Sequence, residues 1–290
     1  MQHFTQIVRG PAASLHMLFL KASAVTLMVT VFSIGVIEAI EITAAELFHR
    51  AEQLHTQGRY AEAEPIYKEA LATAERVLGP DRPEIIPMLN ALADLYHEQG
   101  REREAEPVCR RALALADRML DPQDPAIAFS LNTLADVYRS TYRYVSAEPL
   151  YRRALAILEA ALGPTHPWVV RVLSNLGSLR VNTQHYDEAD KLFQRALEIS
   201  ERAGPASSIQ VAVILSNIAV CAIERGRIAD AEPYLLRSIR IREAALASDD
   251  PAMISLLETY ALVLRKTRRA AQAKQVDVRI AFLREGGLQK

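Results

Sequence analysis

Five residues, Ala63-Glu64-Pro65-Ile66-Tyr67, return along this chain in recognisable form at a constant spacing of 42 residues. The alanine recurs in every copy, at Ala105, Ala147, Ala189, Ala231 and Ala273. A second series keeps the same step: stretches related to Leu89-Asn90-Ala91-Leu92-Ala93 begin at Leu131, Leu173 and Leu215. A fixed period of this length indicates a stack of repeated units, each of which buries its apolar face against its neighbours.

Each repeat contains two helical patterns. Apolar residues recur at i, i+3, i+4 and i+7 within 84–99, and a similar pattern runs through 103–119. Gly100 separates the two patterns, as a glycine near a helix end commonly does. A loop with two prolines, residues 120–125, precedes the next repeat. Each unit is therefore predicted to be a helix, a tight turn, a second helix and a loop.

Small residues are expected to set the distance between the helices. One position of the first helix is occupied only by alanine or glycine, at Ala51, Ala93, Ala135, Gly177, Ala219 and Ala261. A side chain no larger than methyl lets two helix axes approach closely. We expect Tyr67, Tyr151 and Phe193 to fill the space beside them. The end of the first turn of the second helices, where proline costs little, is the expected place of Pro65, Pro107, Pro149 and Pro233.

These spacings resemble the tetratricopeptide repeat (TPR). The 42-residue unit, with Leu-Asn-x-Leu-Ala, Gln-Gly-Arg, Ala-Glu-Pro-x-Tyr and Leu-Gly-Pro-x-x-Pro, looks like the kinesin-light-chain subtype over residues 42–285. The resemblance implies an all-α, right-handed superhelical solenoid of about six helix pairs. The predicted repeat units are 42–79, 84–121, 126–163, 168–204, 209–247 and 252–285.

The first forty residues do not share the period. Between Lys21 and Glu38 runs a stretch of 16 residues without charge, preceded by two basic residues and no acidic one. This order is typical of a secretory signal peptide, so residues 1–39 are predicted to direct export, with cleavage near Ala39. The alternative is an uncleaved membrane anchor formed by residues 17–37. Translation from Met17 instead of Met1 would give a signal peptide of more usual proportions.

The sequence contains no pattern typical of a catalytic or cofactor site. The phosphate-binding glycine loop, the His-Glu-x-x-His motif, the Gly-x-Ser-x-Gly elbow and Cys-x-x-Cys are all missing. The histidines are scattered, so no metal site and no cofactor are expected. The formal net charge is −1, which argues against nucleic acid as a partner, because a binding surface for nucleic acid needs a basic excess.

The resemblance implies that the first helix of each pair lines a concave groove. Four asparagines would lie along it, at Asn90, Asn132, Asn175 and Asn217, the last two shifted by one position. An asparagine side chain both donates and accepts hydrogen bonds, so a row of them can hold the backbone of an extended peptide. The alternative is that these asparagines bond only to neighbouring helices.

Charged residues are expected in the same groove. His55, His97 and Arg139 share one position, with Asp94, Asp136 and Arg171 near them. The lone tryptophan, Trp168, is expected either to cover the loop after Pro167 or to anchor an interface. The sequence thus predicts an exported, non-catalytic scaffold that binds an extended peptide or a partner helix. The alternatives are a membrane-anchored assembly factor and, less favoured, an RNA-binding helical repeat.

Overall fold

The computed structural model describes residues 43–204, 208–245 and 251–284, and every regular element within these ranges is a helix. The all-α fold predicted from the repeat is therefore confirmed. The predicted signal or anchor segments, 1–39 and 17–37, lie outside the described residues. None of the helices in the described ranges combines the length and the apolar character that crossing a bilayer requires.

The chain divides into two compact units, Met1–Leu95 and Tyr96–Lys290. The described part of the first unit holds a helix at 43–56, α2 (Tyr60–Leu78), the short 3₁₀ helix η1 (Pro83–Ile85) and most of α3 (Ile86–Glu98). The second unit holds α4 (Glu102–Met119), α5 (Pro125–Ser140), α6 (Tyr144–Leu162), α7 (Pro167–Asn182), α8 (Tyr186–Arg202), α9 (Ser208–Glu224), η3 (Ile228–Ala231), α10 (Glu232–Ala245), α11 (Pro251–Lys266) and α12 (Ala270–Arg284).

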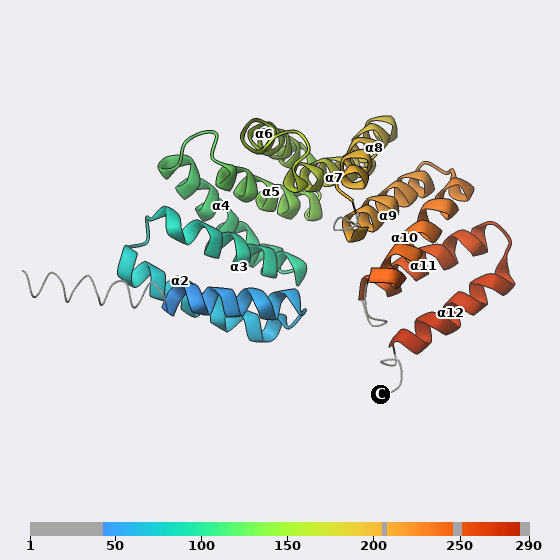
Figure 1. The fold of residues 1–290 in the computed structure, drawn as a ribbon, viewed down its shortest axis with the longest axis horizontal. Coiled ribbons are helices and arrows are strands. Elements are labelled where there is room, and N and C mark those ends of the chain that lie inside the picture. The colour runs from blue at the N-terminus through green and yellow to red at the C-terminus, as the bar shows by residue number, and fades with distance from the viewer. Residues whose placement is uncertain (1–42, 205–207, 246–250, 285–290) are drawn as a thin grey trace, which may run out of the picture. The chain divides into compact units, whose positions relative to one another are not determined.

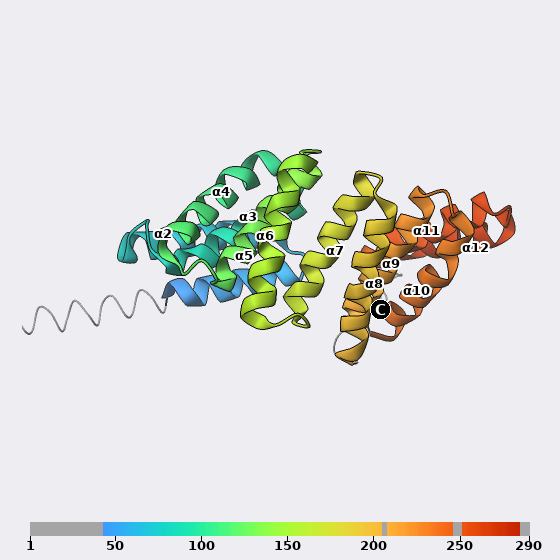
Figure 2. The same ribbon diagram turned by 90° about the horizontal axis from the view of Figure 1, so that it is seen from above.

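Within the second unit the helices pack in chain order from α4 to α12 (Figures 1 and 2). The odd-numbered helices are the first helices of their pairs and the even-numbered ones are the second helices. The second helices α6, α8 and α10 each pack against the first helix before them and the one after them. Contacts also join α5 with α7 and α7 with α9, so the first helices form a face of their own.

The core contains a close contact between a small residue and a large one. The small positions Ala135, Gly177 and Ala219 are completely buried. The ring of Phe193 is also completely buried, and it lies against the backbone of Gly177: a Cβ atom added there would be 2.6 Å from Cε1 of the ring. The short distance between the helices therefore depends on the missing side chain at this position.

The prolines of the Ala-Glu-Pro stretches lie deeper in their helices than predicted. Because α4 begins at Glu102 and α6 at Tyr144, Pro107 and Pro149 are inside the helix, beyond its first turn. Only Pro233 is in a first turn, since η3 precedes α10 and ends at Ala231. The predicted helix starts were therefore too late. An interior proline removes one backbone hydrogen bond and strains the helix, but α4 and α6 continue past it.

The turn between the two helices of a pair needs a left-handed residue. Glycine provides it at Gly100 and Gly226, but Tyr142, Gln184 and Arg268 adopt the same conformation at the equivalent positions, with φ between 61° and 64°. A non-glycine residue in this region is strained. The tight turn is thus imposed by the packing of the two helices and does not depend on glycine.

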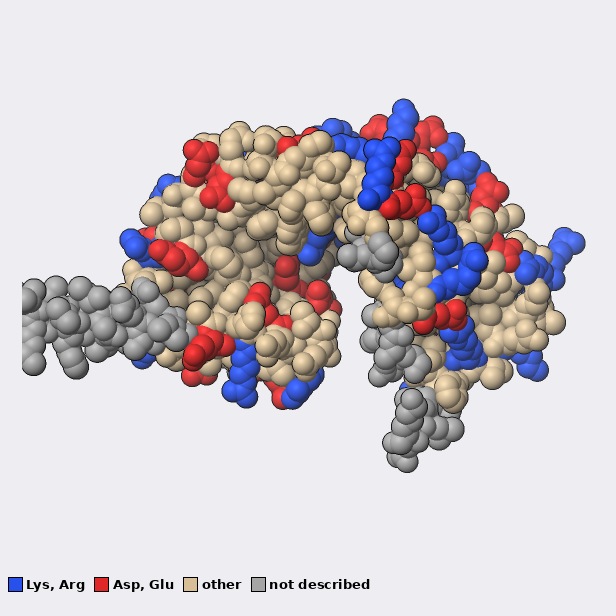
Figure 3. Space-filling model, viewed as in Figure 1, with Lys and Arg blue, Asp and Glu red and all other residues tan. Residues whose placement is uncertain are grey.

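Ion pairs join successive repeats of the second unit. A carboxylate of each second helix meets an arginine of the next second helix, at 2.6 to 2.7 Å, in the pairs Asp117–Arg153, Glu159–Arg195, Glu201–Arg237 and Glu243–Arg279. Figure 3 shows Lys and Arg side chains in blue and Asp and Glu side chains in red lying next to one another on this face of the molecule. Exposed pairs contribute about 0–1 kcal/mol each, so the series adds more to register than to stability.

A second series of ion pairs accounts for the glutamate of Ala-Glu-Pro and for the arginine that ends Gln-Gly-Arg. The glutamate of Ala-Glu-Pro accepts from the arginine that precedes the next second helix, in Glu106–Arg143 at 2.7 Å and Glu232–Arg269 at 2.6 Å. The Arg143 hydrogen bond lowers the pKa of Glu106 below its usual value. The pair therefore stays charged at neutral pH and is lost only as the pH falls through the lowered pKa.

We predict that Gly177→Ala destabilises the protein. The alanine adds about 1 kcal/mol of helix propensity, but its methyl group displaces the buried Phe193 ring, which costs about 1–3 kcal/mol. The midpoint of urea unfolding should therefore fall. In a Phe193→Leu background the same substitution should be neutral or stabilising. An equal loss in both backgrounds would contradict the proposed contact.

Candidate peptide-binding groove

The first-helix face of the second unit carries three of the four predicted asparagines. Asn132 lies on α5, Asn175 on α7 and Asn217 on α9. Asn132 is buried, while Asn175 and Asn217 are half-buried. The three side chains have different environments, and the difference decides what each can do.

Asn132 and Asn175 meet over the carboxylate of Asp136. Nδ2 of Asn132 donates to Oδ2 of Asp136 at 2.9 Å, and Nδ2 of Asn175 lies 3.0 Å from the same oxygen and from Oδ1 of Asn132. The bonds from Asn175 cross from α7 to α5. These two amides therefore join neighbouring repeats. This agrees with the alternative prediction, in which the asparagines bond to neighbouring helices.

The other carboxylate oxygen of Asp136 is bound by the second helix of its own pair. The hydroxyl of Tyr151 donates to Oδ1 at 2.6 Å and accepts from Nε of Arg139 at 3.3 Å. Burial, together with the neighbouring carboxylate, raises the pKa of Tyr151 well above its usual value. A buried charge is tolerated where donors surround it, and Asp136 has donors on α5, α6 and α7.

Asn217 differs, because no hydrogen bond joins its side chain to another residue in the described part of the chain. It lines a cavity of about 240 Å³ between α9 and α11. Val213 and Val220 flank it on α9 and are 39% and 40% exposed. An uncommitted amide between two exposed valines, beside a cavity, can bond to a ligand backbone and accept an apolar side chain.

The rest of the cavity wall comes from α10 and α11. Leu235 and Leu256 are buried apolar residues of the lining, and Ser255 and Thr259 add hydroxyl groups from α11. The predicted groove residues did not include the valines. The available sequence signal was α9 itself, which is apolar on all sides, whereas a helix with one buried face carries polar residues on the other.

Asn90 and Asp94 lie on α3 in the first unit. Asn90 is half-buried, and its Oδ1 atom has no hydrogen-bond partner among the residues that the structure describes. His55 of the same unit lies 3.2 Å from the hydroxyl of Tyr67. His55 thus contacts the second helix of its own pair.

His97 and Arg139 follow the same arrangement in the second unit. His97 Nδ1 lies 2.8 Å from Glu102, and Arg139 lies next to Tyr151, so each contacts its own second helix. Arg139 is also 3.5 Å from Asp136, as expected. The guanidinium group of Arg171 lies over the ring of Trp168 at the start of α7.

Trp168 packs between two groups. Its ring centre is 4.3 Å from that of Phe129 on α5, and Cζ of Arg171 lies 5.0 Å above it. His166 accepts a hydrogen bond from the Trp168 amide and so caps the start of α7. The tryptophan therefore joins α7 to the preceding first helix.

Neither cysteine has the properties of a nucleophile. Cys109 and Cys221 are buried and unbonded to each other. Burial and the adjacent Asp190 carboxylate raise the pKa of Cys221 to about 12. A thiol that stays protonated at neutral pH is inert, because the thiolate is the reactive form.

The sequence profile of the tetratricopeptide repeat matches residues 42–118, 87–160 and 126–202, and a second profile of the same description matches 211–252. The chain belongs to the tetratricopeptide repeat family. Among curated proteins no match was found.

Solved structures show the same TPR fold. BtubC (BKLC) from P. vanneervenii is 20% identical, with a TM-score of 0.59 over 88% of this chain and 93% of that one. A putative kinesin light chain from Podosopora anserina is 17% identical, with a TM-score of 0.57 over 72% and 99%. Aspartyl phosphate phosphatase F from Bacillus subtilis is 16% identical, with a TM-score of 0.58 over 89% and 74%. At these identities the likeness concerns the fold alone.

We predict that Asn132 and Asn217 contribute differently to the free energy of unfolding. Asn132→Ala removes a buried donor from Asp136 and should lower the free energy of unfolding by about 1–3 kcal/mol. Asn217→Ala should change it by less than about 0.5 kcal/mol, because the half-buried Asn217 side chain has no hydrogen bond to lose among the described residues. Urea unfolding of both variants measures the difference. Equal losses would show that Asn217 is also part of the packing.

Proposed function

We propose that this TPR protein is a non-catalytic scaffold that binds an extended peptide or a partner helix along its first-helix face. The observation that supports this most directly is the free amide of Asn217 beside the cavity between α9 and α11. The cavity offers an apolar surface from Val213, Val220 and Leu256, and a peptide that enters it keeps its backbone within reach of one donor and acceptor group.

The asparagines then have two roles in this proposal. Asn132 and Asn175 hold α5 and α7 together through Asp136, which keeps the first helices in register. Asn217 contacts the ligand. A binding surface works best when it is formed before the ligand arrives, because less conformational freedom is lost on binding. The internal network supports such preorganisation.

A scaffold role agrees with the chemistry of the described residues. Catalysis by a nucleophile needs an activated side chain next to a base, and the Cys221 thiol is held in its protonated form. The structural neighbour from Bacillus subtilis is named as a phosphatase, but its likeness to this chain is one of fold. We therefore assign protein binding and no reaction.

The test is a selection of extended peptides on the purified chain, followed by affinity measurements on variants. Peptides that bind the wild type should lose at least about tenfold in affinity on Asn217→Ala and on Val220→Glu, because both act at the cavity. Arg152→Ala, on the exposed side of a second helix, is the matched control and should bind normally. Equal binding by all variants would contradict the groove proposal.

The same measurement addresses the RNA-binding alternative. Single-stranded RNA at low salt should fail to shift the protein, since neutralising phosphates requires a basic surface. A salt-dependent complex whose affinity is unaffected by Val220→Glu would replace the peptide proposal with nucleic-acid binding.

We further propose that the chain is exported and that the scaffold acts outside the cytoplasm after cleavage near Ala39. The support is the order of charges and the apolar stretch in residues 1–39. Expressed from its full sequence, the protein should be released by alkaline carbonate as a shortened chain, and N-terminal sequencing should locate the cleavage. Retention of the full-length chain in the membrane would instead support the anchored assembly factor.

A further inference from the structure

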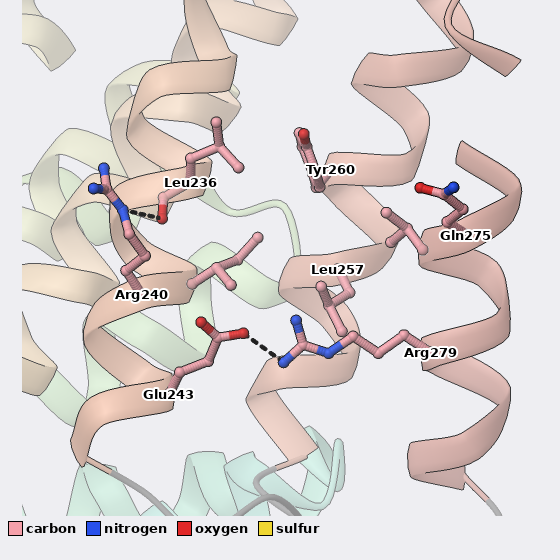
Figure 4. A pocket seen from close by; sticks show the side chains of 9 residues that line it. Leu236, Arg240, Glu243, Leu257, Tyr260, Gln275 and Arg279 are labelled. Atoms are coloured by element: carbon pink, nitrogen blue, oxygen red, sulfur yellow. Dashed lines mark hydrogen bonds and ion pairs between the residues drawn. The ribbon is translucent and has the colours of Figure 1, made fainter. Parts of the chain in front are cut away.

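A second cavity lies on the opposite set of helices. It has a volume of about 680 Å³ and lies between the second helices α10 and α12, with α11 contributing Leu257 and Tyr260 (Figure 4). Ile239 and Val276 line it, and the ion pair between Glu243 and Arg279 runs along one end. It shares no lining residue with the α9–α11 groove.

The repeat itself shows why the cavity exists here. The position occupied by Val276 is occupied by Leu150, Leu192 and Tyr234 in the three preceding repeats. Valine is the smallest of the four, so the space that Tyr234 occupies in the fifth repeat is left open in the last one. The second repeat also carries a valine here, Val108, so the residue is smaller than in the three preceding repeats but is not new to the chain.

A residue at the edge of the cavity, Leu236, also differs from its counterparts in earlier repeats. Leu236 is 37% exposed, at the position of Arg152 and Gln194 in earlier repeats. Arg152 forms an ion pair with Glu148 one turn earlier, at 2.9 Å. Leu236 instead places an apolar side chain in the lining of the cavity, so the apolar surface of the cavity extends to its edge.

Charge around the cavity favours an acidic occupant. Arg240, part of the lining, forms no ion pair with a residue in the described ranges, and it takes the position of Glu198 in the preceding repeat. The other charged residues of the lining, Glu243 and Arg279, are paired with each other, so Arg240 leaves the described lining with one unpaired positive charge. An acidic partner is attracted to such a surface.

We propose that the α10–α12 cavity is a second docking site, for an amphipathic helix of another protein with a bulky apolar residue flanked by carboxylates. The apolar side chain would fill the space beside Val276, and the carboxylates would meet Arg240. A helix is the favoured form because two neighbouring helices present a groove of the shape in which a third one packs. This site is independent of the groove on the first helices.

The repeat supplies variants that should fold normally. Leu236→Gln, Arg240→Glu and Val276→Tyr each introduce the residue that the preceding repeat carries at the same position. The probe is a fluorescent 14-residue peptide, the length of α10, with leucine and phenylalanine on one face and glutamate on the other. Its twin carries lysine in place of glutamate. Binding is measured by anisotropy on the full chain.

The acidic peptide should bind the wild type, and the triple variant should bind it at least about tenfold more weakly. Charge reversal alone, in Arg240→Glu, should weaken the acidic peptide and strengthen its lysine twin. Asn217→Ala, which alters the other face, should leave both affinities unchanged. Circular dichroism and urea unfolding confirm that each variant is folded.

Three results would overturn the proposal. The first is equal binding of the peptide by wild type and triple variant. The second is that the wild type fails to bind the peptide but sediments with phosphatidylglycerol vesicles, whereas the triple variant does not sediment with them. This result would assign the surface to a membrane. The third is a wild-type dimer in sedimentation velocity that the triple variant abolishes, which would assign it to a second copy of the chain.

Discussion

The contact between a small residue of one helix and a large residue of the other supports the rest of the structure. At Gly177 this contact is so close that no side chain fits between the backbone and the Phe193 ring. Protein interiors are packed to the density of organic crystals, so the distance between the helices of a pair follows from the volumes at these positions. The turn between the two helices, in which Gln184 adopts a strained left-handed conformation, depends on that distance.

Polar contacts then set how one repeat is placed on the next within the second unit. The carboxylate of Asp136 collects donors from three helices, and the ion pairs of the second helices join residues 36 positions apart along the chain. Each exposed pair is weak on its own. The pairs fix the alignment of neighbouring helices, because an apolar interface alone would allow the helices to slide along each other.

The two faces of the second unit therefore offer different chemistry. The first helices carry Asn217, which has no hydrogen-bond partner among the described residues, beside a small cavity suited to a peptide backbone. The second helices carry a larger cavity that opens where Val276 replaces a larger residue, with Arg240 at its edge. The two proposed docking sites would let the chain hold two partners at once, and joining them on one chain would raise the effective concentration of each for the other.

The sequence alone determined the period, the all-helical fold, the position of the small residues and the absence of catalytic motifs. These follow from residue type and spacing, which act within one helix or between equivalent positions. It did not determine which asparagines were free: Asn132, Asn175 and Asn217 occupy nearly equivalent positions, yet only the first two reach Asp136. Nor did it locate the cavities or show that the Ala-Glu-Pro glutamate pairs with Arg143 of the next repeat. Those outcomes depend on the rotation and separation of neighbouring helices, and only the tertiary structure fixes both.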